Sequence, residues 1–247
     1  MIRERILGFG AAGTGKSFAW LSMAQAYPNK KFYVIDTDSA IGRMLSTEFT
    51  QVKNVEVFEA QDWISCCKAL DTIKTKITGN DWLVIDLLCS TWSMVQNYFI
   101  SEIFKKDTGD YFLEMRKQMK AGSSSLSVLK GWVDWGTINK LFEDFINLAC
   151  YQLPCNVFFC CKASKLNTED DTETKDAYSS YGIQPAGEKK CSYRVHTVLL
   201  LTHDRHGYYV TTIKDRGRIR VENMALTPEA NFAVKYLQMI AGWEKEL

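Results

Sequence analysis

The fold is decided by the stretch Ile6-Leu7-Gly8-Phe9-Gly10-Ala11-Ala12-Gly13-Thr14-Gly15-Lys16-Ser17, in which a short apolar run passes directly into a glycine-rich turn. Residues 10–17 match the pattern G-x-x-x-x-G-K-[ST] at every fixed position. The apolar run predicts a strand, and the run from Lys16 to Tyr27 predicts a helix that Pro28 ends. Strand, turn and helix in this order are the context in which the pattern binds phosphate. The sequence therefore predicts a nucleotide site.

The chemistry of this turn follows from its residue types. Glycines let several backbone N–H groups point inward around phosphate oxygens, and the N-terminus of the next helix adds a positive dipole. The Lys16 ammonium is expected to reach the β- and γ-phosphates, and the Ser17 hydroxyl to bind Mg²⁺. The expected cofactors are therefore ATP and Mg²⁺. The residues expected to bind them are Gly10, Ala11, Ala12, Gly13, Thr14, Gly15, Lys16 and Ser17.

Acidic residues at the ends of buried strands are candidates for metal binding and for hydrolysis. Asp86 follows the apolar run 82–85 and, with Ser17, is expected to hold the Mg²⁺ ion and its water shell. Its alternative role is to cap the next helix. Hydrolysis also needs a group that polarises the attacking water. Residue 87 is a leucine, so that group has to come from elsewhere, and Asp36 and Asp38 stand at the end of the strand-like run 31–36.

Beyond the turn, short β-rich runs alternate with helical stretches, which is typical of an α/β fold with a mainly parallel, twisted sheet flanked by helices. The runs 193–202 and 208–214 flank a turn at Gly207 and predict a C-terminal antiparallel hairpin. Thr227-Pro228 predicts the start of a last helix at about 228–241. We expect a single domain over residues 1–247. Strands are expected at 6–9, 31–36, 55–58, 82–86 and 157–161, and helices at 16–27, 62–77, 90–104 and 132–151.

Two long segments interrupt this alternation and are expected to be loops. In about 105–130, six Lys and Arg face three Asp and Glu, a local charge of +3, with Tyr111, Phe112 and a Gly-Ser-rich stretch among them. The segment of about 165–190 is net acidic. Loops of this length in a compact domain are more often functional than decorative.

The composition bounds the class of protein. The chain has 247 residues, 46% hydrophobic and 24% charged, so it can bury a sizeable core and is not of a disordered class. Its formal net charge of +1 excludes a global field that attracts polyanions, so any contact with DNA has to come from a local patch. No apolar run is long enough to span a bilayer, and no signal-peptide core follows Met1. We expect a protein of the cytoplasm, the host's if the source is viral, with no membrane partner.

The eight cysteines are consistent with a reducing compartment. Cys66-Cys67 and Cys160-Cys161 are adjacent pairs, the other four are scattered, and no C-x-x-C spacing occurs. A zinc ribbon or a thioredoxin-type motif therefore cannot be written. We expect reduced cysteines that pack as small apolar side chains.

Over residues 6–218 the sequence resembles the RecA-like P-loop ATPases. In that family a catalytic glutamate ends the second strand in an Asp-x-Glu pattern, and Asp38 falls at its position. The run 158–162 corresponds to the strand whose end senses the γ-phosphate, with Cys161-Lys162 where a Gln is usual. The run 213–216 is similar to the Lys-x-Lys/Arg pair that these proteins insert into the neighbouring subunit's ATP site. The resemblance implies a homo-oligomer with ATP sites at subunit interfaces, and catalytic roles for Lys16, Asp38, Asp86, Lys214 and Arg216.

Within this family the chain most resembles the small RecA-core ATPases of bacteriophages associated with single-strand annealing and recombination. The two long segments fall where the RecA family has its DNA-binding loops, so the resemblance implies a DNA partner, single-stranded rather than double-stranded, contacted by 105–130. Two departures stand out. Asp38 is one methylene shorter than Glu, which implies slow turnover, and the acidic 165–190 segment opposes phosphate binding.

The expected function is Mg²⁺-dependent ATP binding and hydrolysis by an oligomeric RecA-like ATPase that acts on DNA in recombination, replication or repair. A phage-type DNA-packaging motor usually carries an acid directly after Asp86, where this chain has leucine. A small-molecule or nucleoside kinase favours an Arg-rich lid over the phosphates, whereas here Lys214 and three arginines at 216, 218 and 220 lie on a late strand. A nucleotide-dependent scaffold without hydrolysis is the alternative if Asp38 does not act as the base.

Overall fold

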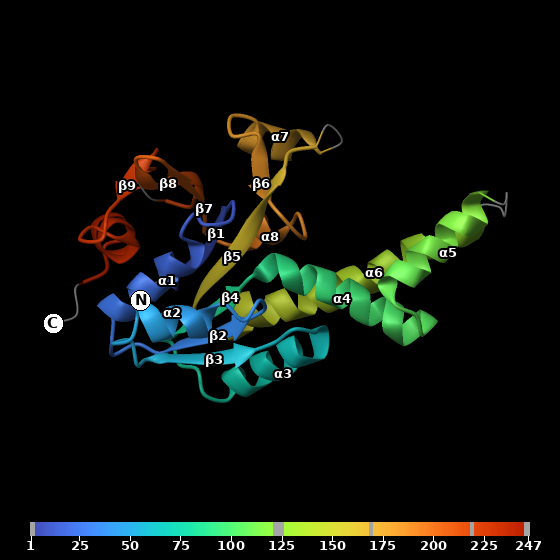
Figure 1. Cartoon of the computed structure of the whole chain (residues 1–247), viewed down its shortest axis with the longest axis horizontal. Helices are drawn as coiled ribbons and strands as arrows, with labels where there is room; N and C mark the ends of the chain where they lie inside the picture. The colour runs from blue at the N-terminus through green and yellow to red at the C-terminus, as the bar shows by residue number, and fades with distance from the viewer. Residues whose placement is uncertain (1–2, 121–125, 168–169, 218–219, 245–247) are drawn as a thin grey trace.

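The computed structural model describes residues 3–120, 126–167, 170–217 and 220–244. One nine-stranded sheet runs through this part of the chain in the order β3-β2-β4-β5-β1-β7-β8-β9, with β6 paired to β5 (Figure 1). The parallel strands are β1 (Arg5–Gly10), β2 (Phe32–Asp36), β3 (Val55–Glu59), β4 (Trp82–Asp86), β5 (Asn156–Lys165) and β7 (Thr197–Asp204). The antiparallel strands are β6 (Ile183–Pro185), β8 (Gly207–Asp215) and β9 (Met224–Leu226). The predicted mainly parallel sheet is confirmed.

Helices flank the sheet. α1 (Lys16–Ala26) packs against the C-terminal π-helix η2 (Ala233–Ile240), and α4 (Leu88–Phe104) packs against both α3 (Trp63–Lys74) and α6 (Leu126–Asn147). The helices predicted at 16–27, 62–77 and 90–104 are confirmed to within a few residues, and α6 begins earlier than the predicted residue 132. The remaining helical elements are α2 (Ile41–Thr47), α5 (Thr108–Lys120), α7 (Thr172–Tyr178), α8 (Cys191–Arg194) and the π-helix η1 (Leu148–Gln152).

The register of the parallel strands gathers their carboxyl ends at one edge of the sheet. Every residue of β2 and β4 is buried, as expected for uniformly apolar strands covered on both faces. In the ladders, Asp36 pairs with Asp86, Asp86 pairs with Cys160, and Gly10 pairs with Lys162. The ends of β2, β4 and β1 therefore lie side by side with the middle of β5, which continues to Lys165, and the glycine-rich turn follows the end of β1.

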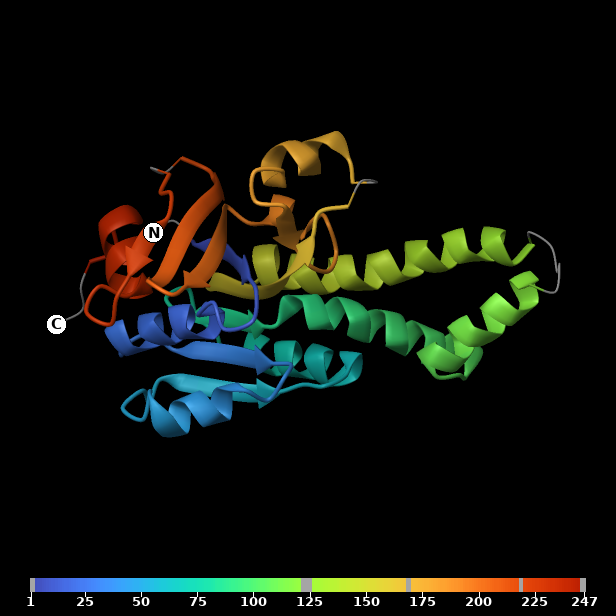
Figure 2. The same ribbon diagram turned by 45° about the horizontal axis from the view of Figure 1, so that its top comes forward.

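The segment expected to be a basic loop at 105–130 is helical over 108–120 and 126–130, so the loop prediction was wrong for these residues. α4, α5 and α6 form a long arm that extends beyond the sheet (Figure 2). The run 113–118, Leu-Glu-Met-Arg-Lys-Gln, consists of strong helix formers, and this propensity prevails over the charge that predicted a loop. The Tyr111 ring packs on Phe104 with ring centroids 4.5 Å apart, and Lys106 pairs with Glu114. The Gly-Ser-rich stretch 121–125 lies outside the described residues.

The second long segment, about 165–190, is only partly a loop. Its acidic residues start a helix, because the Asp171 carboxylate accepts a hydrogen bond of 2.7 Å from the backbone N–H of Thr174 at the N-terminus of α7. After α7 the chain returns as β6, which adds antiparallel to the end of β5. The prediction of an open acidic loop was therefore wrong for this part of the segment.

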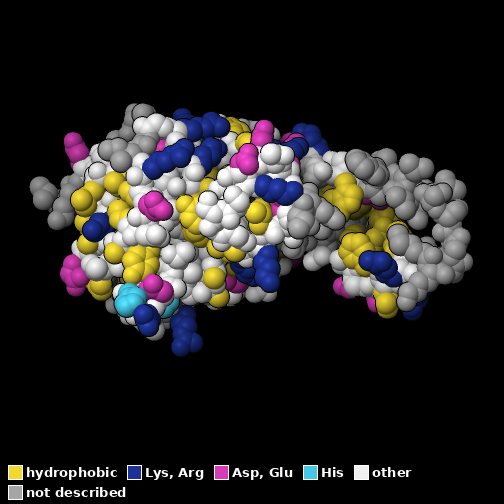
Figure 3. Space-filling model, turned by 90° about the horizontal axis from the view of Figure 1, so that it is seen from above, with side chains coloured by type: hydrophobic (Ala, Val, Ile, Leu, Met, Phe, Trp, Pro, Cys, Tyr) yellow, Lys and Arg dark blue, Asp and Glu magenta, His cyan; other side chains and the backbone are white. Residues whose placement is uncertain are grey.

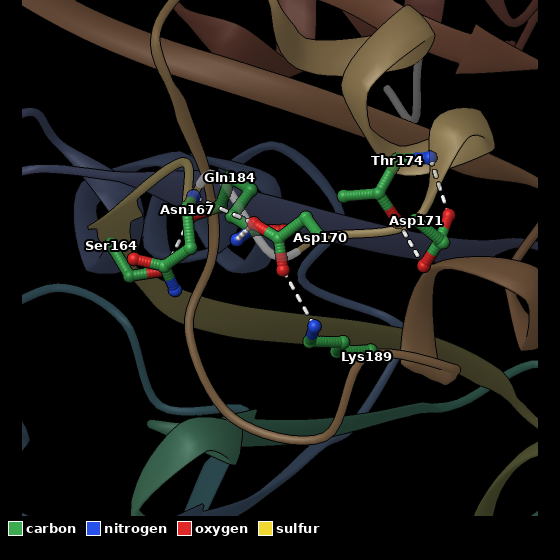
Figure 4. Close-up of polar contacts among 7 residues, drawn as sticks. All are labelled: Ser164, Asn167, Asp170, Asp171, Thr174, Gln184 and Lys189. Carbon is green, nitrogen blue, oxygen red and sulfur yellow. Dashed lines mark hydrogen bonds and ion pairs between the residues drawn. The ribbon is translucent and has the colours of Figure 1, made fainter.

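A buried carboxylate holds this segment together. Asp170 accepts hydrogen bonds of 2.7 Å from the Asn167 backbone N–H and from Gln184 Nε2, and its other oxygen lies 2.5 Å from Lys189 Nζ (Figure 4). Asp170 is buried, so one of the acidic charges of the segment is neutralised locally. The repulsion that the acidic composition predicts towards phosphate is correspondingly smaller.

The C-terminal part differs from the prediction at two boundaries. The hairpin of β7 and β8 is confirmed, but β7 starts at Thr197 because the preceding residues form the short helix α8. The last helix begins at Ala233 and not at 228, so that start was wrong. Asn231 caps it: its Oδ1 accepts hydrogen bonds of 3.1 and 3.3 Å from the N–H groups of Ala233 and Val234. Thr227 caps only a turn before the helix.

The surface carries charges of both signs. On the face in Figure 3, basic, acidic and apolar side chains are interspersed, and several basic side chains gather on one side of the body. This distribution agrees with the small net charge of +1. Across the part of the chain that is described, no helix combines the length and the apolar character needed to cross a membrane.

Candidate nucleotide site

The glycine-rich turn has the backbone conformation that its glycines permit. Gly13 and Gly15 have φ of 76° and 84°, in the left-handed region that favours glycine. Gly10 is needed for a different reason: a Cβ there would lie 2.2 Å from the backbone oxygen of Leu201 on β7 and 2.5 Å from Thr14 Oγ1. The turn can therefore pack directly against β7 only because residue 10 has no side chain.

The Lys16 side chain folds back onto the glycine-rich turn and hydrogen-bonds its backbone. Its Nζ donates to the backbone oxygens of Gly10 at 3.1 Å and Ala11 at 2.6 Å, and Thr14 Oγ1 donates to the same Ala11 oxygen at 2.9 Å. These acceptors are neutral carbonyls. A phosphate oxygen carries negative charge and is the stronger acceptor for an ammonium, so the same side chain can turn to a bound phosphate without a large rearrangement.

Asp86 and Ser17, the two predicted metal ligands, are brought together. Asp86 is 1% exposed, and its Oδ2 accepts a hydrogen bond of 3.0 Å from Trp20 Nε1. Burial raises the pKa of this carboxyl, and hydrogen bonds from Trp20, Ser17 and Cys160 act in the opposite direction. Ser17 at the N-terminus of α1 and Asp86 at the end of β4 form a set of oxygen ligands that suits Mg²⁺, which is usually held by one or two protein groups together with substrate phosphates.

The structure gives different surroundings to Asp38, which the resemblance places at the catalytic position, and to Asp36, the other acid at the end of this strand. Asp36 is fully buried, and its two oxygens accept from the backbone N–H groups of Asp38 at 3.2 Å and Ile41 at 3.1 Å. It is therefore engaged in starting α2. The Asp38 carboxyl is exposed, and its pKa is raised by partial burial, then by the charge of Asp86 and a hydrogen bond with Asp36. Asp38 is thus the more exposed of the two carboxyls, and it lies close enough to Asp86 to feel its charge.

Several supporting residues of this site were not predicted. The Thr37 hydroxyl accepts a hydrogen bond of 2.7 Å from Leu87 N, and the Thr37 N–H donates to Asp86 O at 2.8 Å, so the ends of β2 and β4 are joined. Trp20 holds the Asp86 carboxylate from α1. Trp20 lies in an apolar run and Thr37 lies between two aspartates, and neither belongs to a motif. Nothing in the sequence therefore marks either of them as part of the site.

Lys214 and Arg216 lie away from the glycine-rich turn of their own chain. Lys214 pairs with Val198 near the start of β7, whereas the turn follows the end of β1. Its Nζ donates to the backbone oxygens of Ser192 at 2.6 Å and Val195 at 3.0 Å, and Arg216 Nη2 donates to Tyr193 O at 3.3 Å. Burial, with the Arg216 charge second, lowers the pKa of Lys214. The two cations are thus held against the backbone around α8.

The strand predicted to carry the γ-phosphate sensor passes beside the turn and continues to Lys165. Lys162 pairs with Gly10 across the β1–β5 ladder, and Cys160 pairs with Asp86 across the β4–β5 ladder. The Lys162 side chain is exposed, and its backbone N–H donates to Cys89 Sγ at 3.3 Å. The predicted strand therefore reaches the site, and its Cys160 lies next to the Asp86 carboxylate.

A cavity of about 670 Å³ opens beside the turn. One wall is the turn with the start of α1, the second comes from Met44 and Glu48 at α2, and the third from Tyr208 and the segment before η2. Tyr208 packs close to Gly15, since a Cβ at Gly15 would lie 3.5 Å from its ring. Sequence reasoning missed this cavity because its walls come from three distant parts of the chain. Its other lining residues include Phe18, Leu226, Pro228, Asn231 and Phe232.

Comparison with known proteins places the chain among nucleotide-binding folds. A sequence model of the family described as AAA domain matches residues 3–219. The structure is similar to that of the RadB recombinase, with a TM-score of 0.52 and 13% identity over 90% of this chain and 85% of that chain. It is also similar to a prototypical ATPase from the type III secretion system of pathogenic bacteria, with a TM-score of 0.41 and 14% identity over 81% of this chain and 51% of that chain. No curated protein matches the sequence.

Proposed function

This chain belongs to the AAA domain family of P-loop ATPases, and we propose that it binds ATP with Mg²⁺ and hydrolyses it in a homo-oligomer. The observation that carries the proposal is the meeting of three elements at one edge of the sheet. The glycine-rich turn, Ser17 at the N-terminus of α1, and the buried carboxylate of Asp86 converge there. This combination of phosphate cradle and oxygen ligands suits a magnesium nucleotide.

In this proposal the phosphates lie in the turn formed by residues 10–15, with Lys16 donating to the terminal phosphates. A bound Mg²⁺ would neutralise charge that develops on the phosphates during transfer. Ser17 and Asp86 would hold that ion. Trp20 keeps Asp86 oriented, because its indole N–H occupies one carboxylate oxygen at 3.0 Å.

The neighbouring cavity has the size and lining for the base and ribose of the nucleotide. The rings of Phe18 and Tyr208 offer apolar surface beside the turn. Asn231 uses Oδ1 to cap η2, which leaves its amide hydrogens for a base acceptor, and the exposed Glu48 carboxylate can accept from an amino group. A donor and an acceptor on an apolar pocket are the elements of base recognition.

Asp38 is proposed as the group that polarises the attacking water. It lies at the same edge as Asp86, whose negative charge contributes to the raised pKa of Asp38. A raised pKa makes a carboxylate a better proton acceptor, provided that it stays ionised at neutral pH. The short aspartate side chain places the water further from the carboxylate than a glutamate would, which is why slow turnover is expected.

We propose a homo-oligomer because Lys214 and Arg216 lie at the end of the sheet opposite to the glycine-rich turn of the same chain and do not reach it. Their positions near the start of β7 leave them to act on the site of a second copy. To do so, Lys214 has to exchange two backbone oxygens for phosphate oxygens, an exchange that the negative charge of the phosphates favours.

Single-stranded DNA is the proposed partner, with the arm of α4, α5 and α6 as the contact. Phe112 and Trp135 expose 51% and 45% of their surfaces there, and exposed aromatic rings stack on bases. Lys105 and Lys106 are each paired to a glutamate, so the described part of the arm is less basic than its lysine content suggests. Stacking would therefore contribute more than phosphate contacts, and binding should depend only weakly on salt.

The test is ATP binding and turnover with and without single-stranded DNA at two salt concentrations, using the wild type, Lys16→Ala and Lys53→Ala. Lys53 is an exposed lysine outside the site and serves as the matched control. We expect Lys16→Ala to lose binding or turnover while Lys53→Ala resembles the wild type. Unchanged turnover in Lys16→Ala would remove the nucleotide assignment. Stimulation of ATP turnover by single-stranded DNA is a separate readout, which tests whether DNA is a partner.

A further inference from the structure

Four of the eight cysteines gather beside the proposed nucleotide site. They come from the start of α4, the middle of β5 and the start of α8, and all are buried and free. Their thiols are near enough for each to influence the ionisation of another: Cys89 acts on Cys160 and Cys161, and Cys191 acts on Cys161. The four are Cys89, Cys160, Cys161 and Cys191.

Cys89 differs from the other three in its surroundings. It is the second residue of the 17-residue helix α4, and its Sγ accepts a hydrogen bond of 3.3 Å from the Lys162 backbone N–H. A hydrogen bond from the Cys161 thiol, assisted by the Lys162 N–H, lowers the pKa of Cys89 to about 6 in spite of burial. Its partner Cys161 has its pKa raised, first by the hydrogen bond with Cys89 and then by burial. Cys89 is therefore the more acidic thiol of the two, and its sulfur lies 3.3 Å from the backbone nitrogen of Lys162, the residue that follows Cys161.

The pair is open to small molecules only. Cys89 is 8% exposed and Cys161 1%. The backbone of Gly187 lies over Cys89, since a Cβ built at Gly187 would be 3.2 Å from Cys89 Cα. Such limited exposure favours a reagent of the size of hydrogen peroxide over a bulky alkylating agent.

We propose that Cys89 is a modification site, a thiol that hydrogen peroxide oxidises and that then closes a disulfide with Cys161. The Cys89 thiol loses its proton to solvent and its sulfur attacks one peroxide oxygen, the O–O bond breaks, and the departing hydroxide takes up that proton from solvent and leaves as water. Cys89 is then a sulfenic acid. The Cys161 sulfur attacks the Cys89 sulfur, the S–OH bond breaks, and the hydroxide takes the Cys161 proton to leave as a second water. Two thiols are oxidised to one disulfide, and one peroxide is reduced to two waters.

The location gives this modification a consequence, which rests on the proposed ATPase function. Cys89 lies three residues after Asp86, and Cys161 lies between Cys160, which is hydrogen-bonded to Asp86, and Lys162, which pairs with Gly10. A covalent bond between the sulfurs replaces the hydrogen bonds that now set the spacing of α4 and β5. We expect oxidation to lower ATP turnover by about tenfold or more, and a dithiol reductant to restore it.

The experiment treats the full chain with hydrogen peroxide at neutral pH, removes the peroxide, unfolds the protein to block the remaining thiols, and maps peptides by mass spectrometry without reduction. The wild type should contain a linked Cys89–Cys161 peptide pair lighter by two hydrogen atoms. Cys89→Ser should lose that link, and Cys161→Ala should stop at a sulfenic acid on Cys89. Cys67→Ser is the matched control, because Cys67 is more exposed yet burial raises its pKa to about 11. This variant should form the link as the wild type does.

Two results would overturn the proposal: no link between Cys89 and Cys161, or oxidation of Cys67 ahead of Cys89. The mapping does not depend on nucleotide chemistry, so it separates this proposal from the proposed function. If the link forms and neither form of the protein hydrolyses ATP, the modification site stands and the ATPase assignment fails. If the link forms in an active enzyme and turnover is unchanged, the proposed consequence for catalysis is wrong. Thermal unfolding of each variant in the reduced state checks that it is folded.

Discussion

The contact between the glycine-rich turn and β7 allows a quantitative test with Gly10→Ala. The added Cβ would lie 2.2 Å from Leu201 O and 2.5 Å from Thr14 Oγ1, whereas real Cβ atoms essentially never approach another atom within 3.0 Å. The Thr14 side chain could rotate, but the Leu201 oxygen belongs to the backbone of a buried strand in the same sheet. The clash between the new Cβ and the Leu201 oxygen is therefore relieved only if the end of β1 moves away from β7.

Overpacking of this kind typically costs ~1–3 kcal/mol, and a backbone obstacle places Gly10→Ala at the upper end, about 3 kcal/mol. For a chain of this size ~1 kcal/mol corresponds to roughly 2–4 °C, so we expect the melting temperature to fall by roughly 6–12 °C. The matched control is Gly42→Ala, where the new Cβ meets nothing within 4 Å on the helix α2. Because alanine favours a helix over glycine by ~0.5–1 kcal/mol, this control should melt slightly higher than the wild type.

The assay is thermal unfolding followed by circular dichroism, together with ATP affinity by calorimetry. We expect Gly10→Ala to lose ATP affinity as well as stability, because the displaced end of β1 begins the phosphate turn. The reasoning is refuted if Gly10→Ala melts like the wild type, since the close approach to Leu201 would then be absent. If Gly42→Ala lowered the melting temperature by the same amount, the destabilisation of Gly10→Ala would not come from the contact with Leu201.

Four further predictions concern the site. Asp38→Asn should retain ATP binding and lose turnover by about 10²-fold or more, and full activity would place the base elsewhere. Because the pKa of Asp38 is raised, turnover should fall on acidification at a higher pH than an ordinary aspartate would give, in a pH–rate profile of the wild type. Trp20→Phe removes a hydrogen bond to the buried Asp86 carboxylate and should cost ~1–3 kcal/mol in urea unfolding, with Trp135→Phe as an exposed control. Mixtures of Lys214→Ala with Lys16→Ala should recover part of the turnover that each variant lacks, and no recovery at any ratio would mean that one chain completes its own site.

Much of the sheet was predictable because local sequence and tertiary environment agree there. Uniformly apolar runs such as 82–86 are too short for a buried helix and become strands covered on both faces. The arm was not predictable in the same way. Its helix formers compete with a local excess of charge, and ion pairs such as Lys106 with Glu114 remove part of that charge only once the helices are side by side.

The sequence by itself determined the phosphate turn, because a glycine pattern between a strand and a helix specifies backbone geometry locally. It also pointed to the acids at the ends of two buried strands, Asp86 on one and Asp36 with Asp38 on the other, and the family resemblance favoured Asp38 over Asp36. Only the tertiary structure decided three further features. The Asp36 carboxylate accepts hydrogen bonds from backbone N–H groups, Trp20 orients Asp86, and Cys89 receives hydrogen bonds from β5. These roles depend on partners between 5 and 73 residues away in the chain, and hydrogen bonds between such residues form only when packing brings them together.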